Sequence, residues 1–395
     1  MQKIHSRIGK LRAIIISYIE KYLEKHSLRE TEKDNIFKIL MCRTPLLGSH
    51  TYACPECGQI REIPHSCKSR FCSVCGYVAL QKWIRKRFSF FLNCEYHHVV
   101  VTIPACFRWM IKLDRNLTLN LFAKTAANTI LDWAEKRGFT PGIICFFHSF
   151  GSRLQFHPHF HMLVTCGGVN EEGRWIFGGN SLPGEYFMGI FRARFIAAMK
   201  DLFRQGLLKT KAPLPKVLAI INNSYKKHWQ FYTERITQHS SQTMLYCVRY
   251  AKKMILSEKR IISFDQHKVT FSTKIAEKVV TLTYSLEQFM KCILQHIPEK
   301  NFRLIRYYGF YANNAKKKYQ QALKHKETLQ APILPTTWRY RQFLRDGVDP
   351  LICSLCKIPM LLVKKVFSSL AVITFDMIKS TLNLPLQQPL IWEYG

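Results

Sequence analysis

The sequence predicts an α+β protein whose central part is a ferredoxin-like sheet of the split βαβ type. The main observation is the order of elements between residues 97 and 257, where strand and helix patterns follow one another as β-α-β-β-α-β and a final helix. A second observation is a cysteine-rich segment nearer the N-terminus, with the spacing of a zinc module. With 395 residues and 47% hydrophobic content, the chain can bury several cores.

Two modules are expected before the central sheet. Residues 1–50 should form a helical segment, because apolar residues from Ile8 to Leu23 recur at helical spacing. Residues 51–94 lose this periodicity and gain cysteine, glycine and proline, so they are predicted to form a zinc-ribbon-like module that docks on DNA.

The central sheet is expected within residues 95–275. Its first strand pattern ends in a proline, and the helical pattern that follows ends in a glycine, which are ordinary stop signals for these elements. Two further strands are close enough in sequence to form a hairpin. The predicted elements are strands at 97–103, 143–150, 156–165 and 228–232, with helices at 111–137, 185–207 and 240–257.

After residue 275 the pattern changes twice. Residues 276–345 are basic and are predicted to be a helical C-terminal region. Residues 346–395 are predicted to form an atypical tail, most clearly from Phe367 onward.

Positive charge is the outlying feature of the composition. The chain has 59 Lys+Arg against 26 Asp+Glu, a net charge of +33 that is spread along its whole length. Such a protein attracts polyanions, so nucleic acid is the expected partner, with a basic protein that lacks this role as the alternative. Apolar runs are too short for a membrane span or a signal peptide, which predicts a cytoplasmic protein without a membrane role. In that compartment the 14 cysteines are expected to be metal ligands or buried thiols.

Two cysteine pairs predict one structural Zn²⁺ site. Both are C-x₂-C pairs, and each is followed by a glycine that permits a tight turn around the sulfurs. Fourteen residues separate the pairs, which is close to zinc-ribbon spacing. The expected ligands are Cys54, Cys57, Cys72 and Cys75.

Other ligands and a basic flank surround these pairs. Three neighbours, Cys67, His65 and His50, could replace one ligand or build a second site. A later pair, Cys353 and Cys356, has no partner pair after it, so a metal role for it is left open. Basic residues on both sides of the second pair favour a module that docks on DNA over one with only a structural role. These basic residues are Lys68, Arg70, Lys82, Arg85, Lys86 and Arg87.

Histidines at alternate positions predict a metal site on a strand. Side chains alternate between the two faces of a strand, so His157, His159 and His161 share one face. Two imidazoles two residues apart, His159 and His161, can bind one divalent ion. A surface histidine pair without metal would explain this pattern on its own.

A third ligand is expected from the same hairpin. If the turn pairs Gly151 with Leu154, His148 lies opposite His157 on the histidine face. We therefore prefer His148 as the third ligand over Gln155 and His157.

Two tyrosines at helical spacing are the candidate nucleophiles. Tyr246 and Tyr250 are i and i+4, so they share one face of the predicted helix. Core packing would also explain such a pair, but a phenol attacks only when its anion is stabilised, and positive charge is close by. Lys253 follows Tyr250 by one helical turn and is expected to stabilise the phenolate of the first attacker. The other cations of this stretch are Arg249 and Lys252.

Short matching stretches in one order resemble the IS91-type transposases of the HUH (Y2-type) single-strand endonuclease superfamily. The resemblance covers about residue 40 to about residue 312 and includes the histidine and tyrosine motifs. The stretches are residues 42–44, 48–54, 66–72, 141–144, 148–151, 157–161, 163–164, 167–168, 246–250, 295–298 and 306–311.

The resemblance implies a site-specific DNA transposase that cuts and rejoins single strands at the ends of its element by a rolling-circle-like route. Carried over by position, His159 and His161 resemble the ligands of a catalytic Mg²⁺ or Mn²⁺. Tyr246 and Tyr250 resemble the paired nucleophiles that form a 5′-phosphotyrosine. The four cysteines resemble the family's N-terminal zinc module, and residues 95–275 its endonuclease domain.

Two other functions remain as alternatives. A rolling-circle replication initiator or relaxase shares this chemistry, but the zinc module argues against it. A non-catalytic, zinc-dependent DNA-binding protein would use the histidines and tyrosines only for structure. A carboxylate-triad transposase is disfavoured because the 26 acidic residues form no suggestive cluster. The chain has no P-loop motif, so no nucleotide cofactor is expected.

Overall fold

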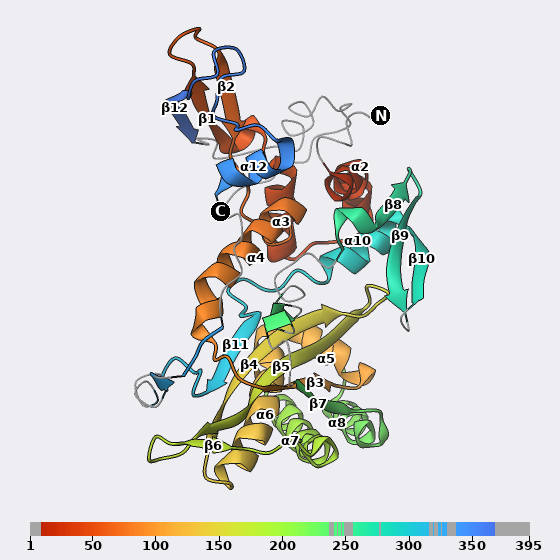
Figure 1. Ribbon diagram of the computed structural model, residues 1–395. Coiled ribbons are helices and arrows are strands. Elements are labelled where there is room, and N and C mark those ends of the chain that lie inside the picture. Colours follow the sequence, from red (N-terminus) through yellow and green to blue (C-terminus); the bar gives the residue numbers. More distant parts are fainter. Residues whose placement is uncertain are drawn as a thin grey trace. The chain divides into compact units, whose positions relative to one another are not determined.

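The computed structural model shows a mixed α+β protein built on antiparallel sheets (Figure 1). Two compact units are each assembled from separated stretches of chain. Unit 1 comprises Met1–Lys86, Lys252–Ile297 and Pro332–Gly395, and unit 2 comprises Arg87–Ala251 and Pro298–Ala331. These units differ from the consecutive segments that the sequence suggests. The described residues are 9–236, 241–242, 244–245, 247–248, 256–275, 278–315, 319, 323–324, 326–329 and 337–367.

An antiparallel sheet forms the centre of unit 2. Within the described residues, its strand order is β11-β4-β5-β3-β7, and the short strand β6 pairs with β5. The longest ladder joins β4 to β5, and β3 pairs with both β5 and β7. The strands are β3 (Tyr96–Thr102), β4 (Thr140–Phe150), β5 (Phe156–Val169), β6 (Trp175–Phe177), β7 (Gln230–Ile236) and β11 (Ile305–Gly309).

Helices α6 and α7 cover one face of this sheet (Figure 1). Phenylalanines recur every four residues along α7, at Phe187, Phe191 and Phe195, so they form one stripe that is fully buried. Phe191 and Phe195 contact Phe122 of α6, whose ring meets Phe160 of β5 edge-on. The helices of unit 2 are α5 (Arg108–Leu113), α6 (Arg115–Glu135), α7 (Gly184–Arg204) and α8 (Leu214–Asn223), with 3₁₀ turns at Phe88–Phe90, Ala105–Phe107 and Ser224–Lys226.

The long helix expected at residues 111–137 is two helices. The chain breaks at Asp114, whose backbone is extended and whose Oδ1 accepts a hydrogen bond from the backbone N–H of Leu117 at 2.9 Å. An N-cap aspartate of this kind starts a new helix, because it satisfies a backbone N–H that has no partner within the helix. The other predicted helix of this unit that lies wholly among the described residues, α7, starts and ends within three residues of its expected bounds.

Unit 1 contains two small antiparallel sheets and several helices. Within the described residues, one sheet has the order β12-β1-β2 and the other β10-β9-β8. Helix α10 packs on α2 and on strands of the second sheet. The elements are α2 (Lys10–Lys25), α3 (Glu30–Met41), β1 (Gly48–Ala53), β2 (Ile60–Pro64), α4 (Ser73–Arg87), β8 (Ile261–Phe264), β9 (Lys268–Ile275), β10 (Lys278–Ser285), α10 (Leu286–Leu294), α12 (Trp338–Asp346) and β12 (Leu361–Phe367), with 3₁₀ turns at Pro45–Leu47 and Glu258–Arg260.

The C-terminal region is less helical than expected. Residues 276–345 contain strands β10 and β11 as well as helices α10 and α12. Strand β10 is rich in valine and threonine, which favour the extended backbone of a sheet over a helix. The start of the predicted atypical tail is also part of the fold, because β12 pairs along the whole of β1. Residues 368–395 lie outside the described part of the chain.

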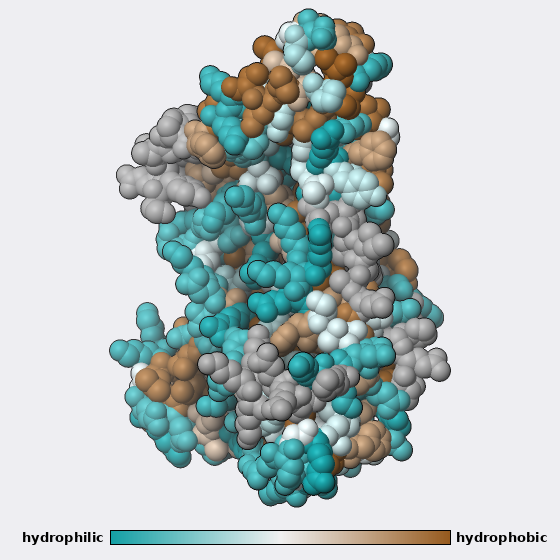
Figure 2. Space-filling model, turned by 60° about the vertical axis from the view of Figure 1, so that its left-hand side comes forward, coloured by the Kyte–Doolittle hydropathy of each residue, from teal (hydrophilic) through white to brown (hydrophobic). Residues whose placement is uncertain are grey.

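Exposed apolar side chains gather on the β12-β1-β2 sheet. They form the hydrophobic area at the top of Figure 2, where all seven residues of β12 are exposed. Among the described helices, none is long and apolar enough to span a membrane.

Candidate functional site

Strand β5 separates an apolar core from a histidine face. Phe156, Phe160 and Met162 point into the core beneath α6 and α7. His159 and His161 occupy the alternate positions, so they point to the opposite face of the sheet, as strand geometry requires.

Three histidines meet on this face. The ligand atoms of His148, His159 and His161 all lie within 4.8 Å of one another. The ring centroid of His148 is 4.2 Å from that of His161 and 5.3 Å from that of His159. Three imidazoles at these separations fit one divalent metal ion.

The register of the hairpin differs from the expected one. His148 of β4 pairs with His159 of β5, not with His157. Two one-residue shifts explain the difference: the backbone N–H of Gly151 donates to the carbonyl of Gln155, one residue beyond the expected Leu154, and the strands are irregular between His148 and Phe150. Within the turn, Leu154 adopts a left-handed backbone, with φ of 58°. The shift leaves His148 on the histidine face but moves it next to His159.

Burial keeps these imidazoles neutral. It lowers the pKa of His159 to about 4 and lowers the pKa values of His148 and His161 well below the ordinary value. Nδ1 of His159 lies 2.7 Å from the carbonyl oxygen of His157, to which it donates as a neutral ring. The lone pair of that ring is then on Nε2, which is the form of histidine that binds a metal.

Two residues of this face were not singled out from the sequence. Nε2 of His98, on β3, lies 2.8 Å from Nδ1 of His161, and the two rings are stacked. The Sγ atom of Cys247 is 3.9 Å from Nε2 of His98, and its carbonyl oxygen is 3.2 Å from Nε2 of His148. Alternation along β3 could have put His98 on one of two faces, but only the pairing of β3 with β5 selects the histidine face.

The other residues expected at this site have different surroundings. His157 contacts a guanidinium nitrogen of Arg108 through its Nδ1 at 3.0 Å. Gln155 accepts a hydrogen bond from the backbone N–H of Arg153 in the turn. Neither belongs to a metal-binding group among the described residues. The expected nucleophiles and their cations, Tyr246, Tyr250, Arg249, Lys252 and Lys253, lie outside the described residues.

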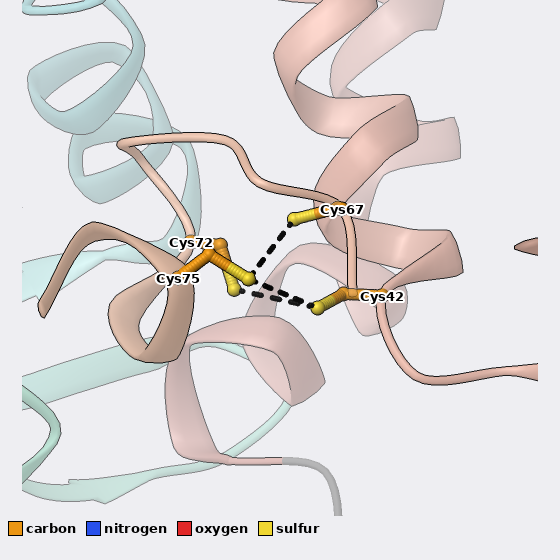
Figure 3. A group of neighbouring side chains, drawn as sticks. All are labelled: Cys42, Cys67, Cys72 and Cys75. Atoms are coloured by element: carbon orange, nitrogen blue, oxygen red, sulfur yellow. Dashed lines mark hydrogen bonds between the residues drawn. The ribbon is translucent and has the colours of Figure 1, made fainter. Parts of the chain in front are cut away.

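A first cysteine group lies between α3, the loop after β2 and the start of α4 (Figure 3). It consists of Cys42, Cys67, Cys72 and Cys75, and three of its sulfur–sulfur distances are 3.6 to 3.7 Å. A tetrahedral zinc ion with Zn–S bonds of about 2.3 Å holds its sulfurs about 3.8 Å apart. The group therefore has the dimensions of a four-thiolate zinc site.

The surroundings of Cys42 favour its thiolate form. Hydrogen bonds from Cys67 and Cys72 lower the pKa of Cys42 to about 7. The guanidinium of Arg12 donates to the carbonyl oxygen of Cys42 at 2.7 Å and supplies positive charge. Gly76 is required where α4 packs against the backbone of Arg70, because a Cβ at residue 76 would lie 2.3 Å from the carbonyl oxygen of Arg70.

A second cysteine group consists of Cys54, Cys57, Cys353 and Cys356, whose sulfurs also all lie within 4.8 Å of one another. The two expected pairs, Cys54 with Cys57 and Cys72 with Cys75, are thus divided between two groups instead of sharing one ion. The physical reason is the β1–β2 hairpin, which carries the first pair at its turn while the second pair starts α4. Neither His50 nor His65 joins a metal-binding group among the described residues; their rings pack against each other.

Basic side chains line the surface beside the first group. Lys82, Arg85 and Lys86 are exposed at i, i+3 and i+4 of α4, so they share one helical face. The loop residues Lys68 and Arg70 are exposed as well, and Arg87 is partly buried.

Comparisons with known proteins agree with the zinc-binding role of the cysteines. Residues 14–103 match the model of the transposase zinc-binding domain, and residues 142–319 match a putative transposase model. The chain is 29% identical over 352 residues to the transposase for insertion sequence element IS801 of Pseudomonas savastanoi pv. phaseolicola, with 85% of this chain and 84% of that protein covered. It is 28% identical over 314 residues to the putative transposase y4qJ of Sinorhizobium fredii (strain NBRC 101917 / NGR234), with 75% and 78% covered. No solved structure matches the chain significantly.

The zinc-binding domain and the histidine-bearing domain together define a transposase of an insertion sequence. Within that class, the chain belongs to the IS91-type transposases with an N-terminal zinc-binding domain. The first cysteine group lies wholly within this domain and fits the zinc that the domain binds.

Proposed function

We propose that this transposase cuts and rejoins single DNA strands through a tyrosine nucleophile beside a metal ion. The observation that carries the proposal is the centre of His148, His159 and His161, against which Cys247 packs. Cys247 directly follows Tyr246 in the chain and is three residues before Tyr250. Both candidate nucleophiles are therefore within three residues in sequence of Cys247, which lies at the histidine centre.

The topology of unit 2 supports an HUH-type nuclease. Four of its strands occur in the sheet order β4-β5-β3-β7 and are antiparallel throughout. If β3, β4, β5 and β7 are numbered one to four by their order in the chain, the order in the sheet is two, three, one, four. Helix α6 follows strand one, and helix α7 follows strand three. This order of strands and helices supports a ferredoxin-like, split βαβ sheet.

The proposed reaction is a transesterification. The phenol oxygen of Tyr250 attacks the scissile phosphorus, and the bond from phosphorus to the 3′ oxygen breaks. The products are a 5′-phosphotyrosine and a 3′-hydroxyl, so the number of phosphodiester bonds is conserved and rejoining needs no ATP. Tyr246 then serves the second strand end.

The chain's own residues prepare this step. Lys253 stabilises the phenolate of Tyr250, and the neutral histidines present lone pairs to a divalent cation. When bound, Mg²⁺ or Mn²⁺ supplies positive charge that draws electron density from the phosphate. The basic face of α4, with Arg249 and Lys252, holds the strand by its phosphates. The expected substrate is single-stranded DNA at the ends of the element.

A nicking assay tests this function. Single-stranded oligonucleotides that tile the DNA flanking the gene are incubated with the full chain and Mn²⁺ or Mg²⁺, and covalent adducts are identified by mass spectrometry. We expect His161→Ala to lower nicking at least about 100-fold, the usual scale for losing a catalytic electrostatic contact. DNA binding should stay nearly unchanged, because the basic surfaces hold the strand.

Matched variants make the test specific. His157→Ala removes a ring from the same strand face but keeps the carbonyl that His159 contacts, so it should retain most activity. Tyr246→Phe and Tyr250→Phe should each retain some nicking, and the double variant should form no adduct. Tyr232→Phe, at an exposed tyrosine of β7, is the control. An adduct that persists in the double variant would reject the assigned nucleophiles, and a wild type that binds DNA without nicking would favour a non-catalytic DNA-binding protein.

A further inference from the structure

The second cysteine group joins two distant parts of the chain. Cys54 and Cys57 lie at the turn between β1 and β2, whereas Cys353 and Cys356 precede β12. The Sγ atoms of Cys57 and Cys353 are 3.7 Å apart across a separation of 296 residues. A tetrahedral zinc site requires about 3.8 Å, and a disulfide would require about 2.05 Å.

The two halves of this group have the same backbone design. In the first half, the backbone N–H of Cys54 donates to the carbonyl of Gln59, and that of Gly58 donates to the carbonyl of Cys54. In the second half, the backbone N–H of Cys353 donates to the carbonyl of Ile358, and that of Lys357 donates to the carbonyl of Cys353.

The backbone also turns in the same way at both halves. The residue after the second cysteine is left-handed in each, with φ of 69° at Gly58 and 59° at Lys357. Such a conformation costs a lysine more than a glycine. Two matched knuckles that face each other are what a metal bound by two C-x₂-C pairs requires.

Among the described residues, the sheet beside this group has almost no core of its own. The buried residues of its cluster are Cys54, Cys353 and Met360, and every residue of β12 is exposed. A cluster this small cannot hold a three-stranded sheet by apolar burial alone, and modules of this kind are normally stabilised by a metal. Four possible zinc ligands therefore lie beside a sheet that apolar burial alone does not stabilise.

We propose that Cys54, Cys57, Cys353 and Cys356 bind a second Zn²⁺, which fastens the segment 350–367 onto the β1–β2 hairpin. The matched part of the zinc-binding domain model ends at residue 103, so two of these ligands lie far outside it. Gln59 adds a polar link between the halves, because its Oε1 accepts a hydrogen bond from Oγ of Ser354. Zinc binding by this group is independent of the nuclease chemistry proposed above.

Metal content tests the proposal. The full chain is purified without chelator, and its zinc is measured by elemental analysis and native mass spectrometry. We expect two zinc ions per chain in the wild type, one in the double variant Cys353→Ser with Cys356→Ser, and one in Cys67→Ser with Cys72→Ser. Cys292→Ser, at a half-buried cysteine outside both groups, should keep two. One zinc in the wild type, or two in the Cys353 and Cys356 variant, would overturn the proposal.

Thiol labelling of the wild type keeps the test valid if a variant fails to fold. Cys57 is exposed and should react quickly with iodoacetamide if it is free. We expect Cys57 and Cys356 to be protected until a strong chelator removes the metal, with the labelling rate of Cys292 as the internal reference. Equal labelling of Cys57 with and without chelator, or a Cys57–Cys353 disulfide in the untreated protein, would contradict a zinc site.

Discussion

At the scale of single residues, His98 is the neighbour that positions a proposed metal ligand. Its Nε2 lies 2.8 Å from Nδ1 of His161, and its ring stacks on that ring with an interplanar angle of 16°. A hydrogen bond to the second nitrogen of a metal-binding histidine fixes the orientation and the tautomer of the ring. His98 therefore acts through His161 and need not touch the DNA.

Replacing His98 should weaken metal binding more than catalysis. We expect His98→Ala to lower Mn²⁺ affinity about 10- to 100-fold, with most nicking restored at saturating Mn²⁺. His98→Gln should recover part of the affinity, because its amide can still hydrogen-bond to His161. Titration of nicking rate against Mn²⁺ separates the two effects.

The adjacent residue provides the control. His97 is buried on the opposite face of β3 and belongs to no metal-binding group among the described residues. His97→Ala should leave the Mn²⁺ affinity unchanged. If both alanine variants lower it equally, the effect is a general loss of packing, and His98 has no positioning role.

At the scale of elements, the pairing of β1 with β12 depends on a glycine. Gly48 has φ of 80°, and a Cβ there would lie 2.2 Å from the carbonyl oxygen of Val366. Alanine would therefore add backbone strain and a clash with the partner strand. The pairing between Gly48 and Phe367 begins the whole ladder, so the damage should spread along β12.

Gly48→Ala should destabilise this sheet more than strain alone explains. Gly347 is the matched control, with φ of 70° at the end of α12 and nothing within 4 Å of an added Cβ. We expect Gly347→Ala to cost about 1 kcal/mol of strain. Gly48→Ala should cost about 1–3 kcal/mol more, from the clash. Hydrogen exchange of β1 amides measures the difference, and equal effects of the two variants would mean that β12 does not pack closely on Gly48.

Elements with a strong local pattern could be predicted from the sequence, and long-range pairings could not. The phenylalanine stripe of α7 predicts a helix and the apolar run of β3 predicts a strand, because each is a regular local pattern of buried residues. Strand β12 looked like part of an atypical tail because its partner, β1, lies about 300 residues earlier. Nothing local marks such a pairing, and the same holds for β11 on β4.

The candidate site divides in the same way. The strand period alone places His159 and His161 on one face, and a turn signal was enough to bring His148 to it, although in another register. The cysteine pairs were recognisable as knuckles, but their partners depend on the fold. Cys42, at the end of α3, has no second cysteine beside it in sequence, so only the structure adds it to Cys72 and Cys75.

At the scale of the whole molecule, the net charge of +33 should govern the affinity for DNA. Basic residues outnumber acidic ones by more than two to one, and the described basic residues beside the first cysteine group are mostly exposed. Each phosphate that a lysine or arginine neutralises releases a counterion, and this release is favourable mainly at low salt. Binding of single strands should therefore be strong and poorly selective at low salt, and selective for the element ends only at higher salt.

This argument predicts a slope that can be measured. If Lys68, Arg70, Lys82, Arg85 and Lys86 each contact one phosphate, these five contacts contribute about −3.5 to the slope of the logarithm of affinity against the logarithm of salt concentration. Affinity for a single-stranded oligonucleotide would then drop at least about 100-fold between 50 and 200 mM salt. Fluorescence anisotropy across a salt series measures this slope.

Neutralising the face of α4 should change the slope by a known amount. In a variant with Lys82→Gln, Arg85→Gln and Lys86→Gln, three proposed phosphate contacts are lost, so the slope should become less steep by about 2. The same number of neutralised lysines elsewhere, at the exposed Lys209, Lys211 and Lys216, is the control for net charge alone. Because counterion release counts contacts and not total charge, the control should keep a slope near the wild-type value. A flat salt response in the wild type, or equal slopes in the two variants, would show that α4 is not where the strand binds.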